Sequence, residues 1–123
     1  NEMYLLHGTK KKVVETIVEG GLDFRIARSG GFYGMGTYFA ENSCKSNQYT
    51  DTDASDQSYM LLCRVNMGKA HHTNVQMGQA RKPPKGCDSV IADTVLSGQV
   101  HREFIVYDNA RVYPEYIITY TRS

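Results

Sequence analysis

The sequence predicts an α+β fold built mainly on antiparallel sheet, with about two short helices. The first reason is that apolar, alternating segments typical of strands recur along the chain, at residues 3–7, 59–67, 89–92, 103–107 and 112–120. The second reason is that only residues 10–19 and the polar stretch after Ala40 have a helical pattern. Strands that outnumber helices and lie far apart in the sequence favour direct strand pairing over repeated βαβ units.

The composition narrows the class of protein. The 123 residues are enough for one domain, residues 1–123, and 41% hydrophobic with 22% charged residues is typical of a globular chain. The formal net charge is +1, from 14 basic and 13 acidic side chains. A charge so close to zero gives no electrostatic basis for direct nucleic-acid or membrane binding. The chain opens directly on a strand pattern, so we expect it to be a piece of a longer protein.

The cysteines indicate the compartment. Cys44, Cys63 and Cys87 are odd in number and have no CxxC spacing, so neither a zinc site nor a disulfide framework is predicted. Reduced thiols in an intracellular protein are the expected state, with nucleus and cytoplasm both open. The sequence also has no apolar run long enough for a transmembrane helix and no signal-peptide pattern.

The first 36 residues are predicted to form a strand, a helix and a loop. The strand at residues 3–7 stops at Gly8, and Thr9 suits the N-cap of a helix over residues 10–19. One face of that helix is apolar and a glycine pair ends it, through Val13, Val14, Ile17, Val18, Gly20 and Gly21. Residues 22–36 have no periodicity and are predicted to be a loop, of a length that is usually functional.

The second half of the chain is predicted to alternate between strands and loops. The strand at residues 59–67 collects four apolar side chains on one side, Leu61, Cys63, Val65 and Met67. Residues 68–86 and 93–101 are predicted to be irregular. Pro114 places the start of the last strand at a sheet edge or a bulge.

His7 ends the first strand pattern and is followed by a glycine. A lone histidine in such a place is more often a satisfied core residue. Gly8 changes that balance, because a residue without a side chain lets its backbone N–H and C=O approach a ligand closely. One donor beside one acceptor is complementary to a carboxamide. Thr9, taken by itself, indicates only a helix cap.

Four glycines precede the aromatic pair Tyr38-Phe39: Gly30, Gly31, Gly34 and Gly36. Their spacing is neither GxGxxG within a βαβ unit nor the Gly-Lys-Ser/Thr ending of a P-loop, so both phosphate-binding motifs are rejected. We interpret these glycines as hinges that give the aromatic segment its freedom.

Tyr38 and Tyr49 are positioned to face each other around a planar ligand, across a turn and a short predicted helix. Aromatic stacking contributes about 0.5–1.5 kcal/mol beyond area burial. The alternative, that both are ordinary core aromatics, has weight in a chain with nine tyrosines. Ser46 lies one helical turn before Tyr49, so its hydroxyl could bond a ligand carbonyl or the backbone carbonyl one turn back.

Glu103 begins the apolar run at residues 104–107. A carboxylate there is costly unless it is paired or used. A solvated strand end beside Arg102 explains the position as well as a functional role does.

Taken together, these fragments resemble the catalytic domain of the poly(ADP-ribose) polymerases, the diphtheria-toxin-like ADP-ribosyltransferases. The Leu-His-Gly-Thr sequence at residues 6–9 is similar to the family's histidine-glycine-serine/threonine motif. Residues 34–49 are similar to its tyrosine motif with the helix that follows, and residues 103–107 to its glutamate motif. Residues 83–90 and 113–120 also fit, and the C-terminal stretch with residues 40–43 looks closest to the tankyrase branch. The resemblance covers nearly the whole chain and implies a compact ADP-ribosyltransferase fold.

The resemblance implies a role for each matching residue. His7, Tyr38 and Glu103 would form the catalytic set, with His7 bonding the adenine-side ribose of NAD and Glu103 the 2′-hydroxyl of the nicotinamide ribose. Gly8 and Ser46 would hold the nicotinamide carboxamide. The complete set of implied NAD contacts is His7, Gly8, Thr9, Tyr38, Phe39, Ala40, Lys45, Ser46 and Tyr49.

The implied activity is NAD-dependent transfer of ADP-ribose to protein side chains with release of nicotinamide, and nicotinamide-mimic inhibitors are expected to bind. Chain elongation to poly(ADP-ribose) is favoured by the complete catalytic set, with mono-transfer as the alternative. A catalytically silent NAD-binding module and an RNA-binding domain are two further classes, and the near-neutral charge disfavours the second. No metal is expected, because residues 50–58 lack the cysteine/histidine cluster of tankyrases. The family's domain normally extends further on the N-terminal side than Asn1, and the short stretch between Ser89 and Glu103 leaves the acceptor open.

Overall fold

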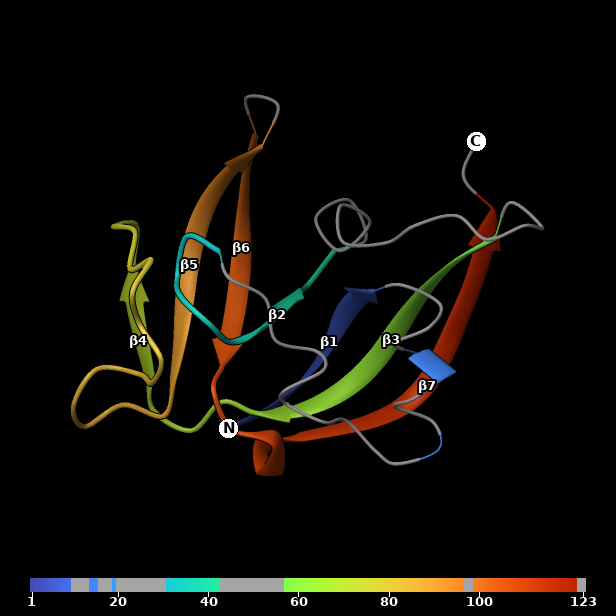
Figure 1. Cartoon of the computed structure of the whole chain (residues 1–123), viewed down its shortest axis with the longest axis horizontal. Helices are drawn as coiled ribbons and strands as arrows, with labels where there is room; N and C mark the ends of the chain where they lie inside the picture. Colours follow the sequence, from blue (N-terminus) through green and yellow to red (C-terminus); the bar gives the residue numbers. More distant parts are fainter. Residues whose placement is uncertain (10–13, 16–18, 20–30, 43–56, 97–98, 122–123) are drawn as a thin grey trace.

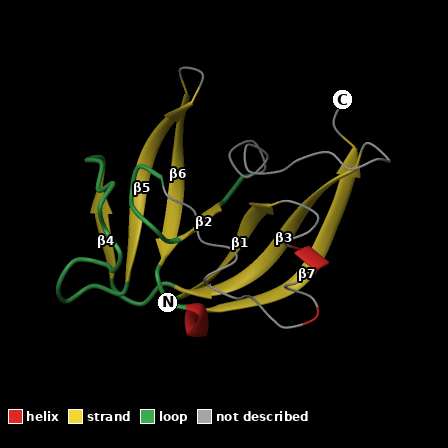
Figure 2. Ribbon diagram, in the orientation of Figure 1, coloured by secondary structure: helices red, strands yellow, loops and turns green. Residues whose placement is uncertain are grey.

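A computed structural model describes residues 1–9, 14–15, 19, 31–42, 57–96 and 99–121 of the chain. These residues form mainly strands with little helix, which is consistent with the α+β class (Figure 1, Figure 2). The strands are β1 (Glu2–Thr9), β2 (Thr37–Ala40), β3 (Gln57–Asn66), β4 (Ala70–Thr73), β5 (Ser89–Leu96), β6 (Gln99–Val106) and β7 (Val112–Thr121), and a 3-10 helix, η2, spans Asn109–Arg111. Within this part of the chain no helix is long and apolar enough to cross a membrane.

The strands join in one seven-stranded sheet with the order β4-β5-β6-β2-β1-β3-β7. Every neighbouring pair is antiparallel except β4 and β5, which are parallel. The sheet is strongly bent, with β4, β5 and β6 on one side, β3 and β7 on the other, and β2 and β1 between them (Figure 1). The two sides meet where β1 and β2 share a single residue pair, Leu6 with Ala40.

Strand alternation sorts the buried side chains into two clusters. The larger cluster holds Leu5, Val14, Phe39, Leu61, Cys63, Val65, Met67, Ile91, Phe104 and Val106. The smaller cluster holds Tyr33, Tyr38, Val90, Ala92 and Ile105. The side predicted for β3 is confirmed, because Leu61, Cys63 and Val65 of the strand and Met67 just after it are buried in the larger cluster, while Asn66, on the other side, is exposed.

Three local predictions are wrong. Gly8 does not stop the first strand, since β1 continues to Thr9 by pairing Gly8 with Met60 of β3. Residues 93–101 are not a loop, because β5 extends to Leu96 and β6 begins at Gln99. The polar residues there pair across the two strands, Asp93 with Arg102 and Thr94 with His101 for example, so pairing between distant residues, and not local polarity, decides that this stretch is strand. Residues 68–86 are not wholly irregular, because β4 pairs with β5.

The predicted helices are tested only in part. Val14, Glu15 and Glu19 are helical, and the other residues of the helix predicted at 10–19 lie outside the described residues. The helix predicted after Ala40 also lies outside them from residue 43 onward, so the number of helices stays a prediction. The prediction for Pro114 is confirmed, because β7 is an edge strand and its register with β3 shifts opposite this proline.

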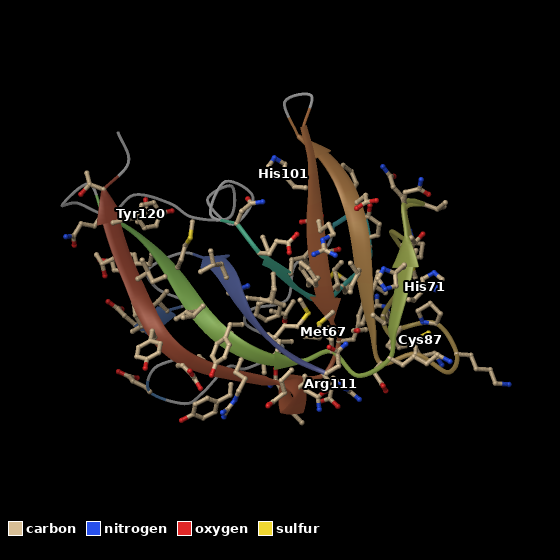
Figure 3. All side chains as sticks on the ribbon, turned by 180° about the vertical axis from the view of Figure 1, so that it is seen from behind. Met67, His71, Cys87, His101, Arg111 and Tyr120 are labelled. Carbon is tan, nitrogen blue, oxygen red and sulfur yellow. The ribbon has the colours of Figure 1, made fainter. Side chains whose placement is uncertain are left out.

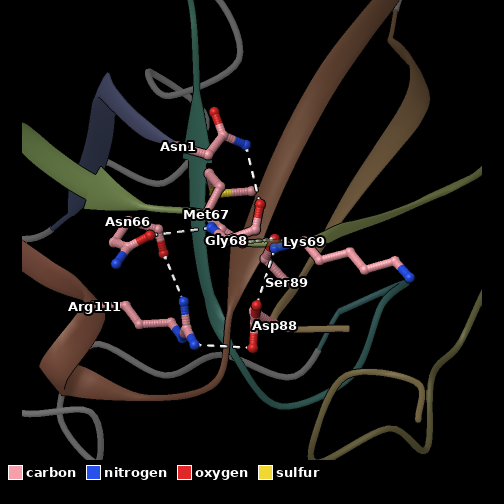
Figure 4. Close-up of polar contacts among 8 residues, drawn as sticks. All are labelled: Asn1, Asn66, Met67, Gly68, Lys69, Asp88, Ser89 and Arg111. Carbon is pink, nitrogen blue, oxygen red and sulfur yellow. Dashed lines mark hydrogen bonds and ion pairs between the residues drawn. The ribbon is translucent and has the colours of Figure 1, made fainter. Parts of the chain in front are cut away.

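A network of polar contacts joins the start of β1, the turn after β3, the start of β5 and η2 (Figure 4). Arg111 lies 2.9 Å from Asp88 Oδ1 and donates to the Asn66 carbonyl at 3.2 Å. Asp88 Oδ2 accepts from the Lys69 N–H at 2.9 Å, and Ser89 Oγ donates to the Met67 carbonyl at 2.6 Å. These contacts hold together the end of the bent sheet at which β1 begins.

Candidate functional site

The sequence-predicted residues converge on the three adjacent strands β6, β2 and β1. Ala40 pairs with Glu103 on one side and with Leu6 on the other, so the three residues form a row across the sheet. Residues directly opposite each other in a ladder carry their side chains on the same face. The side chains of Glu103, Ala40 and Leu6 therefore share one face, to which Tyr38 also belongs. By the same alternation His7 belongs to the opposite face, where its ring contacts Phe39. Glu103 lies one strand away from Tyr38 and two strands away from His7.

His7 joins β1 to β2 through its side chain. Its Nδ1 lies 2.8 Å from the Tyr38 carbonyl oxygen, and its ring centroid lies 5.3 Å from that of Phe39 at a 50° tilt. Because a carbonyl only accepts, Nδ1 carries the proton, which leaves Nε2 as an acceptor. Nε2 is buried and has no hydrogen-bond partner among the residues that the structure describes. Burial also lowers the pKa of His7, against the opposing effect of the bond to Tyr38.

An unpartnered polar atom inside a protein is costly unless a ligand or water bonds it. The imidazole of His7 is 5% exposed, held in one tautomer by the Tyr38 carbonyl, and offers one acceptor lone pair. That arrangement fits a ligand hydroxyl, which can donate to Nε2. The residue is thus packed in the core, as one of the two explanations from the sequence requires, and its part in binding a ligand stays a prediction.

Tyr38 is held by the loop that precedes it. Its hydroxyl donates to the Gly34 carbonyl at 2.7 Å and accepts from the Tyr33 N–H at 3.0 Å. Desolvation raises the pKa of Tyr38 above its ordinary value, and the nearby charge of Glu103 acts in the same direction to a smaller extent. The hydroxyl is therefore neutral and already bonded, so its proton is not available for acid–base chemistry.

Gly34 and Gly36 are placed for close packing rather than for the hinge role that we predicted, and Gly30 lies outside the described residues. Gly34 has a φ of +89°, and a Cβ at that position would lie 2.1 Å from the Ala80 carbonyl oxygen. A Cβ on Gly36 would lie 2.7 Å from Ile105 Cγ2. Both glycines therefore permit close packing of a fixed loop, and a left-handed backbone at Gly34, rather than movement of the aromatic segment.

Glu103 is 2% exposed, which excludes the solvated strand end considered from the sequence. It lies well inside β6, with Arg102 before it and Phe104 after it, and does not begin the strand as its place in the sequence suggested. Burying a carboxylate is costly, so this position is one at which a function or a strong local interaction is expected.

The other predicted residues are placed only in part. Gly8 is buried in β1 and Thr9 is the last residue of that strand, while Phe39 and Ala40 are buried in β2. Lys45, Ser46 and Tyr49 lie outside the described residues, so the second wall of the aromatic clamp stays a prediction. The absence of a metal also stays a prediction, although the described residues contain no cluster of three or more His, Cys, Asp or Glu side chains suited to one.

The sequence did not reveal how residues 41–42 are attached to β6. Glu41 forms an ion pair with Arg102, with 2.7 Å between Oε2 and Nη2, and Asn42 Nδ2 lies 3.2 Å from His101 Nδ1. No local pattern indicates these contacts. They follow from the register of β2 with β6, and opposite charge at Glu41 and Arg102 becomes informative only once that register is known.

Comparison with known proteins gives consistent matches. A family model described as the poly(ADP-ribose) polymerase catalytic domain matches residues 1–99, a range that includes His7 and Tyr38 and ends before Glu103. Protein mono-ADP-ribosyltransferase PARP3 of Mus musculus is 40% identical over 95 residues, which cover 75% of this chain and 18% of that protein. Protein mono-ADP-ribosyltransferase PARP12 of Homo sapiens is 32% identical over 126 residues, covering 100% of this chain and 18% of that protein.

A probable poly(ADP-ribose) polymerase of Dictyostelium discoideum is 31% identical over 125 residues, covering 99% of this chain and 34% of that protein. The chain thus spans less than a fifth of the length of PARP3 and PARP12. The likeness to the tankyrase branch stays a prediction. With a family model over most of its length and these relatives, the chain belongs to the poly(ADP-ribose) polymerase catalytic domain family.

Proposed function

We propose that this domain transfers ADP-ribose from NAD to protein side chains and releases nicotinamide. The observation that carries the proposal is the buried carboxylate of Glu103, set one strand from Tyr38 and two strands from His7. The family to which the chain belongs and the names of the relatives support the same activity.

The chemistry requires a negative charge near the ribose. As nicotinamide leaves, positive charge develops at the ribose carbon, and a carboxylate already in place stabilises it without reorganisation. Glu103 would supply that charge and would also bond the 2′-hydroxyl of the nicotinamide ribose. The same carboxylate can take a proton from the acceptor group as it attacks.

The other residues would bind and orient NAD. His7 Nε2 would accept a hydrogen bond from the adenine-side ribose, because its Nδ1 is committed to the Tyr38 carbonyl. The backbone of Gly8 would bond the nicotinamide carboxamide. Since the Tyr38 hydroxyl is bonded to the loop, this residue would act through its ring and its fixed backbone. Thr9, Phe39, Ala40, Lys45, Ser46 and Tyr49 complete the proposed set, and holding the reactants in a productive orientation supplies a large share of the rate.

For the length of the product, we propose transfer of single ADP-ribose units. Two relatives at 40% and 32% identity are named as mono-ADP-ribosyltransferases, which favours this product over the polymer expected from the sequence. Chain elongation is the second candidate, because the chain carries all three residues of the implied catalytic set and one relative is named as a probable polymerase. The proposed acceptors are intracellular proteins. Nicotinamide mimics are the proposed inhibitors of the domain, and we propose that it does not bind nucleic acid or membranes directly.

Incubation of the protein with labelled NAD and candidate acceptors, followed by gel analysis, tests the proposal. A sharp labelled band is the expected result for mono-transfer, and a smear would instead support chain elongation. Absence of label in every fraction would overturn the proposed activity and support a silent NAD-binding module. Binding of a benzamide-type nicotinamide mimic, measured by calorimetry, then distinguishes such a module from a protein that does not bind NAD.

A further inference from the structure

The pairing of β2 with β6 continues through side chains after its last backbone pair. The register runs from Thr37 opposite Val106 to Ala40 opposite Glu103. In the next position of the same register, Arg102 Nε donates to Glu41 Oε1 at 2.8 Å and Nη2 donates to Oε2 at 2.7 Å. This two-point contact has the parallel geometry in which arginine binds carboxylates most specifically.

The next pair of the register, Asn42 with His101, is bonded on the other face of the ladder. Asn42 Nδ2 lies 3.2 Å from Nδ1 of His101, which is 9% exposed and lies on β6 (Figure 3). Because successive strand residues point to opposite faces, His101 shares the face of Glu103, while Arg102 shares the face of Phe104. The Arg102 guanidinium carbon accordingly lies 5.3 Å from the centroid of the Phe104 ring.

We propose that the two pairs, Glu41 with Arg102 and Asn42 with His101, form a side-chain clip that positions Glu103. The clip binds residues 41–42 to β6 from both faces, so the pair formed by Ala40 and Glu103 lies inside a ladder rather than at its end. Terminal pairs open most easily, and opening here would move Ala40 and the end of β2 away from Glu103, whose own strand β5 holds on the other side. The inference rests on the proposed function, because Glu103 matters most if it acts on the ribose.

The clip is needed because β2 is short and weakly held elsewhere. The strand has four residues, and β1 contributes one backbone pair to it. Arg102 holds the pKa of Glu41 below its ordinary value through their hydrogen bonds, so both partners are charged at neutral pH. The Glu41 side chain is 40% exposed and the Arg102 side chain is 47% exposed, so salt will weaken the ion pair between them.

Neutral variants test the clip in the full-length protein. Arg102→Gln and Glu41→Gln should each lower kcat by about threefold to tenfold, because a small displacement of a catalytic group costs much rate. The KM for NAD and the affinity for 3-aminobenzamide should stay within about twofold of the wild type, because the proposed Gly8 contact is untouched. The double variant Glu41→Arg/Arg102→Glu should recover most of the lost kcat.

Arg64→Gln is the matched control. Arg64 also lies on a strand, makes ion pairs at 3.6 Å with Glu2 and 3.5 Å with Glu115, and lies 5.1 Å from the centroid of the Tyr113 ring. It is likewise an arginine that pairs with carboxylates and lies over an aromatic ring, but on a different part of the sheet, so its loss should leave kcat unchanged. If Arg102→Gln behaves as Arg64→Gln does, or if the charge exchange restores nothing, the positioning role is wrong.

Hydrogen–deuterium exchange separates this inference from the proposed activity. Amides in residues 37–40 and 103–106 should exchange faster in Arg102→Gln than in Arg64→Gln, whether or not the protein transfers ADP-ribose. Unchanged exchange would overturn the clip itself. Faster exchange with unchanged kcat in an active protein would overturn its effect on Glu103. If the wild type transfers no ADP-ribose but Arg102→Gln still exchanges faster than Arg64→Gln, the proposed function is wrong and the clip stands.

Discussion

Glu103 combines deep burial with a place on a central strand, and the proposed chemistry depends on its charge more than on any other. Glu103→Gln keeps the size of the side chain and removes that charge, so we expect kcat to fall by at least about 100-fold, as for other electrostatic groups aimed at a transition state. Transfer from labelled NAD measures the effect, and circular dichroism checks the fold. Glu2→Gln, at an exposed carboxylate of β1, is the control. Full activity of Glu103→Gln would contradict the assigned role.

The burial of His7 predicts a dependence of stability on acid. Its pKa in the folded state is lowered from the ordinary value of 6.5, so the unfolded chain binds a proton more readily than the folded protein does. The contribution of His7 to stability is therefore complete above pH 6.5 and is lost as the pH falls toward and through the lowered folded pKa. Urea midpoints measured from pH 7.5 to 4.5 should decline less in His7→Gln than in the wild type. Identical slopes would show that His7 does not titrate in this way.

At the scale of the element, the loop before β2 is fixed by two glycines and a tyrosine hydroxyl. Gly34→Ala would bring a Cβ against the Ala80 carbonyl oxygen in a left-handed conformation, so we expect a loss of about 2 kcal/mol or more in the free energy of unfolding. Gly78→Ala is the control, since a Cβ there has no neighbour within 4 Å. Urea titration of both variants decides the matter, and an equal effect of the two substitutions would refute the packing argument.

Much of the element pattern could be predicted from the sequence because it depends on local periodicity. The alternation from Leu61 to Met67 sets the buried side of β3 without reference to any other strand. The hairpin of β5 and β6 could not be found in this way, because Asp93 and Arg102 are strand residues only by virtue of pairing with each other. The position of Ala40 opposite Glu103, on which the candidate site depends, is likewise a property of non-local register.

At the scale of the whole molecule, the site and the core share residues. Phe104 follows Glu103 on β6 and lies fully buried in the larger cluster. Phe104→Ala should lower the free energy of unfolding by about 3–5 kcal/mol, because it leaves a cavity among close-packed side chains. Val75→Ala, at a side chain that is 67% exposed, should change it by less than about 0.5 kcal/mol. Denaturant unfolding measures both, and a small effect at Phe104 would mean that the cluster rearranges to fill the space.

The single residue pair between β1 and β2 gives the molecule a mechanical property. A sheet resists bending in proportion to the length of the ladders that join its strands, and here the central ladder is one pair long, reinforced by the bond from His7 to the Tyr38 carbonyl. We therefore expect the sheet to bend more easily between β1 and β2 than within either of its two sides. A molecule that binds both His7 on β1 and Glu103 on β6 would connect the two sides of the sheet. Its affinity would therefore depend on the angle between them.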